Sequence, residues 1–214
     1  MPRQLSFLGL YATLVGIILA FPLIVVVAVS LDPGSYIRFP VTGYTLRWYG
    51  AMWSNETVVL SIVNSLIVGI SSALIGAIVA LPAALVIANG GRFANSVLYP
   101  FLLSPFAVPW LVYGLGLLFF WSAIGLRLSL WTLIAGHTVI GIPYILRVTL
   151  AVLRDMPPNL VRAARIAGAT PFRAFVHVTL PYVSRGLAAG VTFAIDVSLT
   201  NNPIGLFVTT ADNI

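Results

Sequence analysis

The sequence predicts an all-α fold, a bundle of helices that cross a membrane several times. The chain of 214 residues is 60% hydrophobic and only 7% charged, whereas soluble domains carry about 25% charged residues. A soluble domain of this size exposes too much surface to hide so many apolar side chains. The few charges also leave long uncharged stretches, each of which exceeds the roughly 20 residues that one membrane-crossing helix needs. These two observations predict a polytopic membrane protein.

Five apolar stretches predict the spans. We expect membrane helices at about residues 8–31, 58–88, 97–124, 129–153 and 186–208. They are too long for membrane-barrel strands, which alternate over about 10 residues. The fifth stretch is interrupted by Asp196 and by Thr200-Asn201-Asn202-Pro203. We expect a single transmembrane domain over 1–214, with a long loop at 154–185 between the fourth and fifth spans.

The positions of the arginines predict the orientation of the spans. The formal net charge is +6, and all 11 basic residues are arginine. With the N-terminus inside, eight of them face the cytoplasm (Arg3, Arg92 and the six from Arg147 to Arg185), and three lie outside (Arg38, Arg47 and Arg127). Cytoplasmic loops carry such an excess of positive charge. The 154–185 loop is therefore expected inside, where anionic headgroups or a cytoplasmic partner would meet its arginines.

The first half of this loop predicts a short amphipathic helix. Proline at 157 and 158 ends the preceding span and suits the first turn of a new helix. Leu160, Ala163, Ala164 and Ala167 recur at i, i+3, i+4 and i+7, which places them on one helical face. Arg162 and Arg165 lie on the other side. Gly168 follows as a natural helix stop.

The second half predicts another helix at an angle to the first. Thr170 is a suitable N-cap and Pro171 a suitable first-turn residue. Apolar residues then repeat with helical spacing (Phe172, Phe175, Val176 and Thr179), and Leu180-Pro181 is expected to end this helix before the chain re-enters the membrane. Periodicity alone leaves two interpretations open: a segment lying on lipid headgroups, or a rigid element presented to a soluble partner.

The loop resembles the signature loop of binding-protein-dependent ABC transporter permeases. That pattern is Glu-Ala-Ala, three residues, Gly, and about nine residues to an aliphatic-x-Leu-Pro; here it reads Arg162-Ala163-Ala164-x-x-x-Gly168 and Val178-Thr179-Leu180-Pro181. Other segments are similar to spermidine/putrescine-type permeases: the external loop from Ser30 to Tyr49, Asn64-Ser65-Leu66, Leu103-Ser104-Pro105, His137-Thr138, Pro143-Tyr144 and Arg147. The resemblance covers roughly residues 1–208.

The resemblance implies a type I ABC importer permease in a bacterial or archaeal cytoplasmic membrane. Such a subunit forms half of a translocation pathway for a small solute, polyamine-like in this subfamily, and pairs with a second permease or with itself. An external binding protein delivers the solute, and a cytoplasmic ATPase dimer holds the ATP and Mg²⁺. The loop at 159–181 would dock on that ATPase through the residues that match or flank the signature: Leu160, Arg162, Ala163, Ala164, Ala167, Gly168, Pro171, Leu180 and Pro181.

Two features depart from the family pattern. Arg162 stands where the family has a glutamate, so the polar contact of that glutamate is not expected here. Five spans are visible where the family usually has six. The alternative to a working permease is therefore a non-transporting membrane scaffold, or a truncated or degenerate permease.

Asp196, Thr200 and Asn201 are the candidate pathway residues. A carboxylate about 15 Å into the fifth span would be costly in lipid, so Asp196 should face the bundle interior or water. It is either a contact for a cationic solute or a hydrogen-bonded structural acid. In the family, acidic residues usually fall a few positions later, where this chain has Thr200 and Asn201.

The remaining residues exclude most enzyme chemistry. The chain has no cysteine, which excludes thiolate catalysis and cysteine metal sites. It has no lysine either, so it cannot carry the P-loop lysine of an ATPase. His137 has no second histidine or carboxylate at ligand spacing, and we expect it to pack with one hydrogen bond. No catalytic residue, metal site or bound cofactor is expected on this chain.

Overall fold

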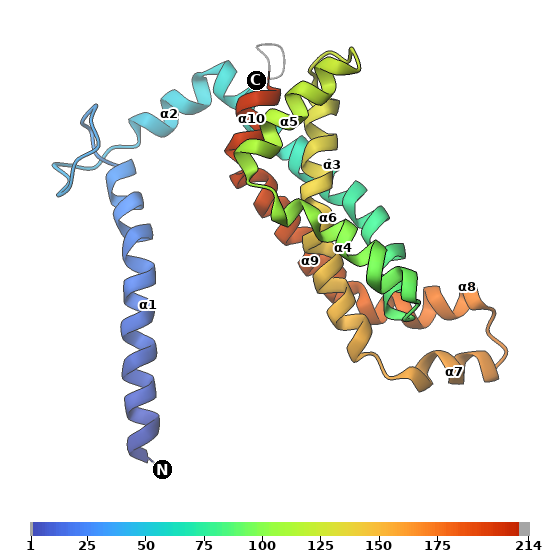
Figure 1. The fold of residues 1–214 in the computed structure, drawn as a ribbon. Coiled ribbons are helices and arrows are strands. Elements are labelled where there is room, and N and C mark those ends of the chain that lie inside the picture. Colours follow the sequence, from blue (N-terminus) through green and yellow to red (C-terminus); the bar gives the residue numbers. More distant parts are fainter. Residues whose placement is uncertain (1, 210–214) are drawn as a thin grey trace. The chain divides into compact units, whose positions relative to one another are not determined.

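The computed structural model describes residues 2–209, with side chains from residue 7 onward, and all the regular secondary structure in this part of the chain is helical. The predicted all-α fold is confirmed (Figure 1). Residues 1 and 210–214, at the ends of the expected 1–214 domain, lie outside the described residues. The elements in chain order are α1 (Pro2–Ser30), α2 (Arg47–Ser54), α3 (Glu56–Ala88), η1 (Ala94–Leu98), α4 (Tyr99–Leu103), η2 (Ser104–Ala107), α5 (Trp110–Ala123), α6 (Leu130–Asp155), α7 (Pro158–Ile166), α8 (Pro171–Ala174), η3 (Phe175–Thr179), α9 (Leu180–Thr200) and α10 (Asn202–Val208).

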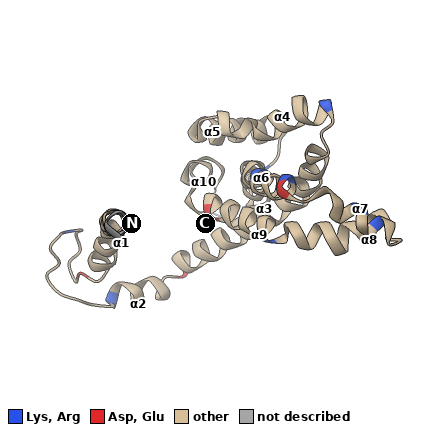
Figure 2. Cartoon of the chain, turned by 90° about the horizontal axis from the view of Figure 1, so that it is seen from below, with Lys and Arg blue, Asp and Glu red and all other residues tan. Residues whose placement is uncertain are grey.

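Within the described residues, four helices are long and apolar enough to cross a membrane: Phe7–Ser30, Glu56–Ala88, Leu130–Asp155 and Pro171–Thr200. A bent pair, Ala94–Ala107 with Trp110–Ala123, gives a fifth candidate if it is counted as one span. Figure 2 shows that charged residues are sparse along the helices and that blue, basic segments lie on α7 and α8.

The stretch expected as a span at about 97–124 is not one straight helix, because the chain bends there by 103° between η2 and α5. Val108 is extended, with φ −96° and ψ 124°, and Pro109 follows it. Steric contact with a proline ring pushes the preceding residue out of the helical region. The proline also lacks the N–H that would continue the helix. The apolar composition of this stretch conceals the break.

The second loop helix does not end at Leu180-Pro181, contrary to the prediction. Residues Pro171–Thr200 form one continuous helical run, in which η3 is a π-helical turn. The N–H of Leu180 donates to the carbonyl of Phe175, five residues back. Pro181 then follows, with no N–H to place. The widened turn thus lets the helix pass the proline.

η1 uses the same arrangement. The N–H of Tyr99 donates to the carbonyl of Ala94, again directly before a proline, Pro100. Both π-helical turns therefore sit immediately ahead of an X-Pro pair. In each case the hydrogen-bond register changes where the proline would otherwise interrupt the helix.

The chain divides into two compact units, Met1–Val59 and Leu60–Ile214. The core of the second unit is the packing of α6 against α9. Glycine permits this packing, because a Cβ built on Gly190 would lie only 2.9 Å from Cα of Ile145 and 3.3 Å from its carbonyl oxygen. Farther along, Gly141 faces the Ala194 side chain in the same way. Small residues at such crossings let membrane helices approach closely.

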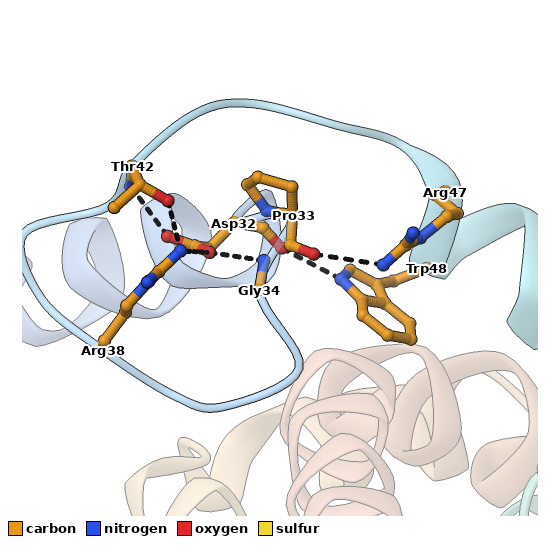
Figure 3. Close-up of polar contacts among 7 residues, drawn as sticks. All are labelled: Asp32, Pro33, Gly34, Arg38, Thr42, Arg47 and Trp48. Carbon is orange, nitrogen blue, oxygen red and sulfur yellow. Dashed lines mark hydrogen bonds and ion pairs between the residues drawn. The ribbon is translucent and has the colours of Figure 1, made fainter.

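The first unit holds α1, a loop and α2. The loop is fixed around Asp32, whose side chain is almost fully buried (Figure 3). Its Oδ1 accepts from the Gly34 N–H at 2.6 Å and its Oδ2 from the Thr42 N–H at 2.8 Å. Arg38 lies 3.4 Å from Oδ1 and also donates to the Thr42 hydroxyl. The indole N–H of Trp48 donates to the Asp32 carbonyl at 2.9 Å, which ties the start of α2 to the loop.

Candidate functional site

The turn between α7 and α8 has the local geometry that the sequence predicts. Gly168 has φ +89°, in the region that glycine alone adopts readily. Its N–H donates to the carbonyl of Arg165, and the N–H of Ala169 donates to the carbonyl of Ala164, both at 3.0 Å. These two bonds form a Schellman motif, which satisfies carbonyls left free at the end of α7. The prediction of Gly168 as the helix stop is confirmed.

The start of α8 also follows the prediction. The Thr170 hydroxyl accepts from the Arg173 N–H at 3.3 Å, and Pro171 occupies the first helical position. At the other side of the loop, the Tyr182 hydroxyl donates to the Asp155 carbonyl at 3.2 Å. This bond joins the end of α6 to the beginning of α9, so both arms of the loop are held to one another.

α7 turns one side toward the protein and leaves the other free. Val161 and Ala164 are half-buried, whereas the remaining α7 residues are exposed. Three of the four residues expected to form a packing face are exposed: Leu160 and Ala163 on α7, and Ala167 directly after it. Ile166 is 89% exposed and Phe172 on α8 is 74% exposed. The loop therefore offers a surface with apolar side chains and small alanines, beside Arg162 and Arg165.

The structure separates the three candidate pathway residues. Asp196 and Thr200 are exposed on α9, and the Thr200 hydroxyl donates to the Asp196 carbonyl at 2.9 Å. Thr192, one turn before Asp196, is exposed on the same side of α9. Asn201 lies elsewhere, with only 3% of its surface exposed, at the break between α9 and α10.

Asn201 lines a cleft of about 680 Å³ within the second unit. The cleft is formed by α3, the starts of α5 and α6, and the segment from Ser198 to Thr209. Its polar lining residues in the described part of the chain are Ser61, Asn64, Ser65, His137, Ser198, Asn201, Asn202 and Thr209. Asp196 is not among the lining residues.

Sequence reasoning missed most of this cleft. Ser61, Asn64 and Ser65 recur at i, i+3 and i+4 of α3, a helical polar stripe that could have been found in the second span. His137 was expected to pack with one hydrogen bond. It is buried, its Nδ1 lies 2.9 Å from the carbonyl of Leu133, and it also lines the cleft.

The loop between α1 and α2 lowers the pKa of Asp32. The backbone N–H groups of Thr42 and Gly34, followed by Arg38, hold the pKa of this carboxyl below its usual range. Hydrogen bonds to the charged form favour ionisation. The carboxylate therefore stays charged and holds the loop at neutral pH. Within the described residues, no group of three or more His, Cys, Asp or Glu side chains could hold a metal ion.

Comparison with known proteins gives one family and several distant relatives. Residues 74–212 match the family model described as the binding-protein-dependent transport system inner membrane component. The spermidine/putrescine transport system permease protein PotC of Escherichia coli K12 is 24% identical over 207 residues, covering 94% of this chain and 76% of PotC. The putrescine transport system permease protein PotI of the same strain is 27% identical, covering 87% of this chain and 69% of PotI. PotC of Haemophilus influenzae is 22% identical, with 89% and 74% covered.

Proposed function

The chain belongs to the family of binding-protein-dependent transport system inner membrane components, and on this premise we propose how it couples to its partners and what it carries. It is the permease subunit of an ABC importer, a multi-pass inner membrane protein that is not itself an enzyme and holds no cofactor. The family implies an importer complex with a separate ATPase and a binding protein.

The α7–α8 turn is the proposed docking element for the ATPase. The observation that supports it is a turn closed by backbone hydrogen bonds, whose exposed side carries Leu160, Ala163 and Ala167. Tertiary contacts bury little of this side, so it is available to a partner. Ala164 lies on the half-buried side of α7 that faces the rest of the protein. Gly168 and Pro171 set the angle between α7 and α8. Leu180 and Pro181 are the first residues of α9, so a movement of the turn would pass through them into this helix.

Arg162 gives this docking surface a positive charge where a glutamate is usual. Its side chain is exposed, and the structure records no ion pair for it among residues 7–209. The ATPase groove that receives it should therefore offer a carboxylate or a backbone carbonyl. The arginine bias of the loops supports an orientation with this turn, and the N-terminus, in the cytoplasm.

A polyamine-like cation is the proposed substrate class. The names of PotC and PotI support it, and so does Asp196, an exposed carboxylate on a membrane-spanning helix. A charge at such depth is costly in lipid, so Asp196 should face water, a partner subunit or a cation. Thr200 lies beside it and would supply a hydroxyl to the same surface. The partner permease is a second subunit or a second copy of this chain.

The coupling role is tested by replacing Gly168 with Trp in the full chain. A side chain at φ +89° strains the backbone, and the indole would occupy the docking surface. We expect the variant to insert but to lose co-purification with the ATPase and solute uptake. Gly90→Trp is the matched control, because Gly90 also has φ +81° with open space around it and lies in another expected cytoplasmic turn.

Two outcomes would decide the assignment. Normal uptake by the Gly168→Trp variant would exclude the turn as the coupling element. If both tryptophan variants fail to accumulate in the membrane, Gly168→Asn replaces them, since asparagine tolerates this backbone region, and it should retain the ATPase. A chain that never brings down an ATPase would support the scaffold alternative instead.

A further inference from the structure

The cleft lined by Asn201 contains polar side chains that lack hydrogen-bond partners. Both the Oδ1 and the Nδ2 of Asn201 make no hydrogen bond, although the residue is only 3% exposed. The hydroxyl of Ser198, also in the lining, is likewise buried without a partner. Native proteins leave few buried polar groups unsatisfied, and each such group calls for an explanation. A ligand with its own donors and acceptors would satisfy these groups.

His137 adds a defined acceptor to the same cleft. Its Nδ1 lies 2.9 Å from the Leu133 carbonyl. A carbonyl oxygen only accepts, so Nδ1 carries the proton of this bond. In the neutral ring the Nε2 atom is then an acceptor. The lining thus combines an acceptor on His137, a hydroxyl on Ser198, and a donor and an acceptor on Asn201.

Within residues 7–209, the lining of the cleft carries no charge that would balance an ion. None of the described residues that line it is an aspartate, glutamate or arginine. Asp196 points from the exposed side of α9 instead. An ion held by these residues alone would lose its hydration without gaining a counter-charge, which is costly. A volume of about 680 Å³ falls in the range of small-molecule sites.

We propose that this cleft binds an uncharged solute rich in hydroxyl or amide groups, with Asn201 as its central contact. The inference rests on the permease assignment alone, because the pathway of an importer brings its solute to the cleft. It is the alternative to the polyamine-like cation, since the two solute classes predict opposite charge preferences at this cleft. The proposed site lies within one chain, and it is separate from the exposed surface of α9 that carries Asp196.

The cysteine-free sequence allows a direct test by thiol labelling. Ser65→Cys places a reporter in the cleft, since Ser65 lines it and its hydroxyl donates to the Ser61 carbonyl of its own helix. Thr192→Cys on the exposed side of α9 is the matched reporter, because its hydroxyl also bonds a carbonyl of its own helix. The full chain in lipid vesicles is treated with hydroxyethyl, trimethylammonium-ethyl and sulfonatoethyl methanethiosulfonate, which differ only in charge.

The expected result is a preference for the neutral reagent at Ser65→Cys. After division by the rates at Thr192→Cys, the hydroxyethyl reagent should react about tenfold faster or more than either ion. Adding Asn201→Leu should remove most of this preference. If that variant does not fold, Ser198→Ala, which changes little volume, should lower the preference measurably.

Three results would overturn the proposal: a cationic reagent that reacts as fast as the neutral one, a thiol that no reagent reaches, or a preference that survives both substitutions. The proposed function would fail on different measurements: the unsubstituted chain would not co-purify with an ATPase, or its assembled complex would not take up spermidine. Neither of those readouts enters the labelling ratio, so the two failures are distinguishable.

Discussion

Gly190 should be the position at which the smallest substitution does the most damage to the membrane bundle. In a Gly190→Ala variant the new methyl group would lie 2.9 Å from Cα of Ile145, 3.3 Å from its carbonyl oxygen and 3.5 Å from its carbonyl carbon. All three neighbours are backbone atoms, so no rotamer change on α6 can relieve the contact. The two helices must move apart instead.

The expected magnitude follows from this geometry. Carbon atoms pack best at about 3.5–4.0 Å, so α6 and α9 must separate locally by roughly 1 Å. Overpacking of this kind costs about 1–3 kcal/mol. Alanine also raises helix propensity over glycine by about 1 kcal/mol, which acts in the opposite direction and must be measured separately.

Gly116→Ala measures that opposing effect. Gly116 is exposed on α5, and a Cβ built on it meets nothing within 4 Å. We expect Gly116→Ala to leave the free energy of unfolding unchanged or slightly raised. The difference between the two variants isolates the packing contribution.

Equilibrium unfolding in mixed detergent micelles with increasing SDS, followed by tryptophan fluorescence, provides the assay. Gly190→Ala should be about 1–3 kcal/mol less stable than Gly116→Ala. Because α6 and α9 carry the two arms of the α7–α8 turn, it should also weaken ATPase co-purification. Equal stability of the two variants would refute the close α6–α9 contact.

Three further predictions concern the loop, the turn and the exposed face of α9. The pKa of Asp32 is lower in the folded loop than in the unfolded chain, so its stabilising contribution should be complete above pH of about 3.9 and lost as pH falls through the folded value; Trp48 fluorescence should report this transition, and Asp32→Asn should abolish it. Thr170→Ala should destabilise the turn by about 0.5–2 kcal/mol, which faster local hydrogen exchange would reveal and unchanged exchange would contradict. Asp196→Asn should reduce spermidine uptake by the assembled complex while leaving ATPase co-purification intact, and unchanged uptake would remove Asp196 as a cation contact.

The sequence by itself determined the features that depend on composition or on a few neighbouring residues. The low charge and the apolar stretches predicted the helical membrane fold. Gly168, Thr170 and Pro171 predicted the turn, because a Schellman motif and an N-cap involve only residues within about five positions of each other. Nothing distant in the chain is needed to form them.

Two helix boundaries required knowledge of the backbone. The helix breaks at Pro109 but continues through Pro181, although both prolines lie within apolar stretches. A π-helical turn accommodates Pro181, whereas Val108 takes the extended conformation before Pro109. The presence of a proline in the sequence does not determine whether the helix breaks or continues through a π-helical turn.

The cleft was decided by tertiary structure. Its lining joins α3 at Ser65, α6 at His137 and the α9–α10 break at Asn201, which lie far apart in the sequence. Helical periodicity gives only the direction of each side chain about the axis of its own helix. Whether Asn201 faces lipid, a partner or a cavity is set by how the helices cross, and that crossing follows from backbone contacts between residues many turns apart.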